Sequence, residues 1–95
     1  MNFNKLTPAE TERLAILMEE ASEVIHICGK ILRHGYNSFD PTKDNPPNNR
    51  HLLHVEIAHF SVAVQRMIEA EDLDSRIIDI AYDKKSESNN YLHHQ

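Results

Sequence analysis

Three glutamates and one histidine have the types and the spacing of ligands for a divalent metal ion. Glu20 and Glu23 are three residues apart, and Glu56 and His59 repeat that spacing later in the chain. Residues three apart on an α-helix lie on one face, so each pair brings its side chains together. Two carboxylates held that close repel each other unless a cation lies between them. Hard divalent ions such as Mg²⁺ and Mn²⁺ prefer such oxygen ligands, so the spacing predicts a metal site shared by two helices.

The first helix that must carry these residues has clear end signals. Thr7 is the expected N-cap, Pro8 occupies the first helical position, and Glu10 completes a capping box. No breaker follows until about residue 33 or 34. Gly35 then suits the residue that closes the helix in the left-handed αL conformation.

Two further helices are expected after the first. Asn48 or Asn49 can cap the second, which should run from about residue 50 to 71. Asp74 is the expected N-cap of a third, less regular helix over about residues 75–85, with a possible continuation toward residue 92.

The expected fold class is all-α, a partial helical bundle of two long antiparallel helices plus a shorter C-terminal helix. One domain spanning residues 1–95 is the default for this length. Because so few helices bury a thin core, we expect oligomerisation to complete the bundle. Residues 35–48 hold three prolines and three asparagines and are expected to form a long loop. Residues 86–95 are expected to be a mobile tail.

Glu56 is the residue that is hardest to explain as surface charge. On a helical wheel it falls inside the apolar stripe of the second helix, where an unpaired carboxylate costs several kcal/mol. Glu20 lies between a small patch of Ile16 and Ile27 and a broad apolar arc. That arc consists of Leu14, Leu17, Met18, Ala21, Val24, Ile25, Cys28, Ile31 and Leu32. Spacing alone leaves two alternatives open, a solvated Glu20 and a Glu56 paired with arginine or histidine.

The composition excludes several classes of protein. Ten basic and fifteen acidic residues give a net charge of −5, whereas nucleic-acid binding needs a basic face. No run of about 18 apolar residues is present, so no membrane span is expected. The first residues lack the apolar core of a signal peptide, and the single cysteine, Cys28, cannot form an internal disulfide. We therefore expect a cytoplasmic protein with no nucleic-acid or membrane partner.

At this point the sequence resembles the MazG-like nucleotide pyrophosphohydrolases, and more narrowly their small phage-encoded members. The resemblance covers about residues 14 to 85. It is carried by the segments EEASEVI (19–25), RHGYNSFDP (33–41), NR (49–50) and VEIAH (55–59). The family pattern is E-x-x-E followed, after a spacer, by E-x-x-D. The order of these motifs together with the loop is more specific than either motif alone.

The resemblance implies a Mg²⁺-dependent enzyme that cleaves ribo- or deoxynucleoside triphosphates to monophosphate and pyrophosphate. It also implies a homodimer or homotetramer, in the host cytoplasm if the chain is phage-encoded. Glu20 and Glu23 match the first motif and Glu56 opens the second, so these three are the expected catalytic residues. His59 stands where the family has aspartate. Because a neutral imidazole favours Mn²⁺ or Zn²⁺ over Mg²⁺, full activity, weakened activity and a dead relative that binds nucleotide or protein all stay open.

The remaining candidates concern the substrate. Cations are expected to meet its phosphates, and the candidates are Lys30, Arg33, Arg50 and Lys84. A cation in such a position is more often surface charge that keeps the protein in solution than a ligand contact. Glu19 or Glu23 is a candidate to accept the proton of the attacking water. Tyr36 and Phe39 in the loop either stack on a base or hold the loop against the core.

Overall fold

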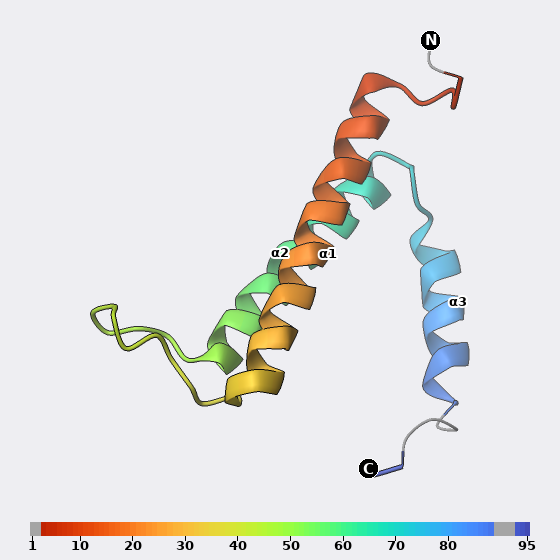
Figure 1. Cartoon of the computed structure of the whole chain (residues 1–95). Coiled ribbons are helices and arrows are strands. Elements are labelled where there is room, and N and C mark those ends of the chain that lie inside the picture. The colour runs from red at the N-terminus through yellow and green to blue at the C-terminus, as the bar shows by residue number, and fades with distance from the viewer. Residues whose placement is uncertain (1–2, 89–92) are drawn as a thin grey trace.

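The computed structural model describes residues 3–88 and 93–95 and contains three helices (Figure 1). They are α1 (Pro8–His34), α2 (Asn49–Glu69) and α3 (Ser75–Ser86). No strand forms within the described ranges, and the predicted all-α class is confirmed. Part of the predicted mobile tail, residues 89–92, lies outside the described residues. None of the helices described is long and apolar enough to cross a membrane.

The helices α1 and α2 lie side by side as an antiparallel hairpin, whereas α3 stands clear of it (Figure 1). This confirms two long antiparallel helices and a shorter C-terminal one. The predicted completion of the bundle by other copies stays a prediction. The exposed surface of the hairpin is where such copies would bind.

The ends of α1 follow from local hydrogen bonds. The Thr7 hydroxyl accepts from the Glu10 N–H at 3.1 Å, and the Glu10 carboxylate accepts from the Thr7 N–H at 2.8 Å, so the predicted capping box is confirmed. Gly35 ends the helix with φ 89° and ψ 165°. The positive φ was expected, but the αL prediction is wrong because ψ is extended. That ψ directs the Gly35 carbonyl toward the Asn49 side-chain amide, which donates to it at 3.2 Å.

The starts of α2 and α3 also depend on side-chain caps. The Asn48 side chain accepts from the His51 N–H at 2.9 Å, so Asn48, and not Asn49, is the N-cap of α2. The Asp74 carboxylate accepts from the Arg76 N–H at 2.9 Å, which confirms the predicted cap of α3. The predicted end of α2 at residue 71 was too late, because Glu71 has a left-handed φ of 65° and turns the chain.

The loop between α1 and α2 folds back on itself to reach the start of α2. The Asn49 N–H donates to the Ser38 carbonyl and the Arg50 N–H to the Tyr36 carbonyl, both at 2.9 Å. An isolated antiparallel bridge pairs Phe39 with Asn48. These bonds satisfy backbone groups at the N-terminus of α2 and fix where that helix begins.

The apolar core of the hairpin is thin and lies on an unexpected part of α1. The buried apolar side chains of the described residues are Ile27 on α1 and Ala63 and Met67 on α2. Ile27 belongs to the small patch of the first helix, so α1 packs through the region between that patch and the broad arc. Glu20 is therefore placed on the packing face. The outer part of the broad arc faces solvent, with Met18 72% and Leu32 88% exposed.

A bidentate ion pair ties the far end of the hairpin together. The Arg13 guanidinium donates through Nε and Nη2 to the two carboxylate oxygens of Asp72, which lies in the turn between α2 and α3. Neither side chain is fully exposed. The hydrogen bonds from Arg13 hold the pKa of Asp72 below its ordinary value of 3.8.

We predict that Gly35→Ala destabilises the fold by about 1–3 kcal/mol, because this φ and ψ combination is strained for any residue with a Cβ. Chemical denaturation, followed by helical circular dichroism, measures the change. Asn37→Ala is the control, since Asn37 is exposed and its φ is not positive. Equal stability of Gly35→Ala and the natural chain would show that the turn does not hold this conformation.

We also predict that Asp72→Asn lowers the melting temperature near neutral pH. Because the pKa of Asp72 is depressed in the folded state, its contribution is present above about pH 4 and is lost as the pH falls through the folded-state value. The difference from the natural chain should therefore shrink in acid. Asp79→Asn, on exposed α3, is the control. A difference that stays constant from about pH 7 to pH 3 would contradict the ion pair.

Candidate metal centre

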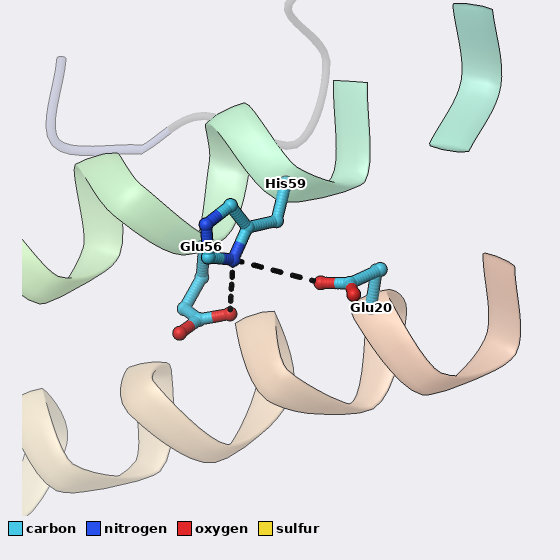
Figure 2. A group of neighbouring side chains, drawn as sticks. All are labelled: Glu20, Glu56 and His59. Atoms are coloured by element: carbon cyan, nitrogen blue, oxygen red, sulfur yellow. Dashed lines mark ion pairs between the residues drawn. The ribbon is translucent and has the colours of Figure 1, made fainter. Parts of the chain in front are cut away.

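Glu20, Glu56 and His59 converge across the α1–α2 hairpin (Figure 2). Glu20 comes from α1, and the other two lie one turn apart on α2. His59 Nδ1 is 3.8 Å from Glu20 Oε2 and 3.7 Å from Glu56 Oε2. One ligand atom from each residue lies within 4.8 Å of the other two. Three of the four side chains predicted as ligands therefore lie close together, and they come from two helices.

The two carboxylates lack the protein partners that would neutralise them. Their side chains are only 24% and 21% exposed, and that of His59 is 55% exposed. Within residues 3–88 and 93–95, neither Glu20 nor Glu56 pairs with lysine or arginine or accepts a hydrogen bond from another group. The distances to His59 are too long for hydrogen bonds. Two acidic groups on a packing face thus meet only an imidazole.

Two of the three separations in this group match those between ligands of a divalent ion. Ligand atoms that surround an ion at about 2.1 Å lie roughly 3 to 4.2 Å from one another, and the two distances to His59 fall in that range. Two carboxylates and one imidazole supply three ligands and leave coordination positions for water or a phosphate oxygen. The nitrogen ligand moves the preference from Mg²⁺ toward Mn²⁺ or Zn²⁺.

A proton is the simplest competitor of a metal ion at this cluster. If His59 is protonated, the imidazolium lies close to both carboxylates and offsets part of their repulsion. Metal binding requires the neutral imidazole instead. The same three side chains therefore support either a metal centre or a small ion-pair cluster, and the two are distinguished by the response to added metal.

The structure does not bring the other predicted site residues into this group. Glu23 is exposed on α1, one turn beyond Glu20, and is not among the three residues that meet. Arg33 is exposed near the end of α1. The guanidinium of Arg50 lies 4.4 Å from the centre of the Tyr36 ring, which engages both in a cation–π contact. Lys84 is on α3, which stands clear of the hairpin.

Lys30 faces a separate cavity of about 500 Å³ at the loop end of the hairpin. Its lining residues are Lys30, His34, Ser38, Phe39, Asp40, Pro41 and Asn49. Asp40 is largely engaged within the loop, because the Thr42 hydroxyl and N–H donate to its carboxylate and lower its pKa. Lys30 lies ten residues after Glu20, about 15 Å along the helix, and does not line the hollow that contains Glu20.

Arg66 is the residue that the sequence reasoning missed. A hollow of about 250 Å³ adjoins the cluster and is lined by Ile16, Glu20, His59, Val62, Ala63 and Arg66. Arg66 is seven residues after His59, and this spacing places both on one face of α2. That spacing was visible in the sequence, but only the packing of α1 shows that the face borders Glu20.

We predict that Mn²⁺ raises the melting temperature of the natural chain and that Glu56→Gln abolishes this rise. At about 100 times its dissociation constant, a bound ion stabilises the folded state by about 2.7 kcal/mol. In the presence of a chelator, Glu56→Gln should be at least as stable as the natural chain, since one of two facing carboxylates loses its charge. Glu12→Gln, an exposed glutamate of α1, is the control. If neither Mn²⁺ nor Mg²⁺ changes the melting temperature of the natural chain, the result would favour the ion-pair cluster.

Comparisons with known proteins add no family to this picture. No family model matches the chain, and neither the curated proteins nor the solved structures that were compared include a match. The resemblance to the MazG-like enzymes therefore depends on the residues quoted for it, and the activity that it implies is a proposal.

Proposed function

We propose that the protein is a metal-dependent nucleoside triphosphate pyrophosphohydrolase, which converts a ribo- or deoxynucleoside triphosphate to the monophosphate and pyrophosphate. The observation that carries the proposal is the convergence of Glu20, Glu56 and His59 from two helices. A structural role accounts less well for two partly buried carboxylates that pair with no lysine or arginine of residues 3–88 and 93–95. The two sequence motifs contain Glu20 and Glu56, and His59 occupies the position of the motif's aspartate.

The proposed reaction is a displacement at the α-phosphorus. The oxygen of a water molecule forms the new bond to phosphorus, the bond from phosphorus to the α–β bridging oxygen breaks, and pyrophosphate leaves with the electron pair. A bound divalent ion would supply charge neutralisation on the phosphate oxygens and a more acidic water. Glu23 is exposed one turn from Glu20 and is the carboxylate of the motif left to accept the proton of the water.

Arg66 gives the proposed site a cation that lines the hollow beside the cluster. Its side chain lines the hollow that also contains Glu20 and His59, so a phosphate group at the cluster lies within the same hollow. A guanidinium binds phosphate oxygens in a bidentate fashion and stays charged at all working pH values. Arg66 therefore replaces Lys30 and Arg50 as the preferred phosphate ligand within one chain. Because the overall charge is −5, an anionic substrate depends on local positive charge, which a bound metal ion and a placed cation such as Arg66 would supply.

A second candidate function is favoured by the position of His59 between both carboxylates. An imidazolium there reduces the repulsion without any metal. The chain would then be a catalytically inactive relative that acts as a nucleotide-binding or protein-interaction module. Whether the histidine at position 59 permits catalysis thus decides between the two functions.

We predict pyrophosphate release from at least one nucleoside or deoxynucleoside triphosphate, faster with Mn²⁺ than with Mg²⁺ because of the imidazole ligand. Glu56→Gln should lower the rate by at least about 100-fold, since loss of residues that merely support ligands already costs 10- to 100-fold. His59→Asp should shift the preference toward Mg²⁺. Glu12→Gln should leave the rate unchanged.

Each result of this assay has a definite meaning. Absence of turnover with every nucleotide and both metals would overturn the enzymatic proposal. If His59→Asp then creates activity, the natural chain is an inactive relative with an intact scaffold. If nucleotide binds neither to the natural chain nor to His59→Asp, the resemblance to nucleotide hydrolases does not reflect a shared function.

A further inference from the structure

A second feature of α1, independent of the metal centre, is an apolar stripe that α2 does not cover. Its members recur at alternating intervals of four and three residues and are Leu14, Met18, Ala21, Ile25, Cys28 and Leu32. Four of the larger ones, Leu14, Met18, Ile25 and Leu32, are exposed, and so is Cys28. A helix that packs against one neighbour needs an apolar stripe of only about 100°. The stripe therefore indicates a second neighbour for α1.

The charges of α1 avoid this stripe. Between Leu14 and Leu32, all ionisable side chains except Cys28 fall within about 120° of the helical wheel, a third of its circumference. They are Glu19, Glu20, Glu23, His26 and Lys30. Between Leu14 and Leu32 the rest of the helix surface carries no charge, although packing against α2 uses only part of it. An exposed helix face this free of charge is typical of an interface.

The helix α2 extends the same surface. Leu53, Ile57, Phe60, Val64 and Ile68 also follow intervals of three and four residues, and Ile57 is exposed. A hollow lined by Cys28, Ile31, Leu32, Tyr36 and Leu53 shows that the two stripes adjoin. The hollow at the metal centre shares none of these residues. One side of the hairpin is thus apolar, and the candidate site opens elsewhere.

The stripe of α1 is complementary to itself in one orientation. Its intervals of 4, 3, 4, 3 and 4 residues read the same in both directions. An antiparallel copy therefore sets Leu14 against Leu32, Met18 against Cys28, and Ala21 against Ile25. At two of these three levels a large side chain meets a small one, which favours interdigitation. A parallel copy would set Ala21 against Ala21 and Ile25 against Ile25, which leaves a void beside a crowded layer.

Charge favours the same orientation. The first turn of α1 contains Glu10, whereas its last turn contains Arg33 and His34. Antiparallel packing brings the acidic end of one helix to the basic end of the other and also opposes their macrodipoles favourably. A parallel pair would place like charges together at both ends.

We propose that a second copy of the chain docks on this face, with the two α1 helices antiparallel about a two-fold axis that passes between Ala21 and Ile25. Such an interface is isologous, so each copy contributes the same surface. The two hairpins then form a four-helix arrangement, and each keeps its Glu20, Glu56 and His59 cluster outside the new interface. The proposal does not depend on the enzymatic activity, because it uses none of the site residues.

The first test is the mass in solution. Light scattering coupled to size exclusion should give twice the 11.0 kDa of one chain. Ile25→Asp places one carboxylate from each copy near the axis and should weaken the dimer by at least about 100-fold, since unpaired like charges in an interface cost several kcal/mol. His26→Asp adds the same residue one position on, within the charged arc, and should leave the dimer intact. A monomer for the natural chain at about 100 μM, well above the affinity range of specific dimers, would overturn the proposal.

The second test is the register, and it does not depend on a destabilised variant. In the antiparallel dimer, the two Cys28 side chains are about ten residues apart along the helices, roughly 15 Å. A shorter bismaleimide should therefore not cross-link the natural chain, whereas Met18→Cys should be captured as a covalent dimer through Cys28 of the other copy. The double variant Met18→Cys, Cys28→Ser should lose the cross-link. Capture of the natural chain through Cys28 would instead show a parallel pair, and a dimer unaffected by Ile25→Asp would show that another surface, such as α3, is used.

Discussion

The packing of α1 against α2 is the constraint on which the rest of the structure depends. Its apolar part is small, since Ile27, Ala63 and Met67 are its buried members. With so few buried side chains between them, one helix could shift along the other at little cost in apolar packing. Polar interactions at the two ends prevent that shift. Asn49 donates to the Gly35 carbonyl at the loop end, and Arg13 binds Asp72 at the other end.

These two polar interactions have a direct consequence for the candidate site. A slide by one helical turn would move Glu20 by about 5.4 Å relative to Glu56 and His59 and would break the cluster. Polar groups that fix register at modest net stability are a known use of partly buried ion pairs. In this chain they set the distance between carboxylates on different helices. The geometry of the cluster is therefore determined by residues that never touch it.

The sequence predicted what local interactions decide. The capping box at Thr7, the cap at Asp74 and the start of α1 depend on residues within one turn, and the structure confirms them. The exceptional position of Glu56 was also readable, because a single helical wheel shows it. The packing face of α1 could not be predicted from the sequence, since the apolar residues extend around far more of the helix than one neighbour can cover. Only the position of α2 selects Ile27 and exposes Met18.

The errors have the same origin. The extended ψ of Gly35 lets its carbonyl accept a hydrogen bond from the side-chain amide of Asn49, fourteen residues away. Arg66 borders the site only because α1 brings Glu20 to it. The fold thus gives α1 three faces: one against α2 that includes Glu20 of the cluster, one that carries the other charged side chains between Leu14 and Leu32, and one that is apolar and uncovered. A chain with so few buried apolar side chains gains little to offset the entropy of ordering two long helices. The proposed second copy on the uncovered face would supply that burial, on the side of α1 where no residue of the cluster lies.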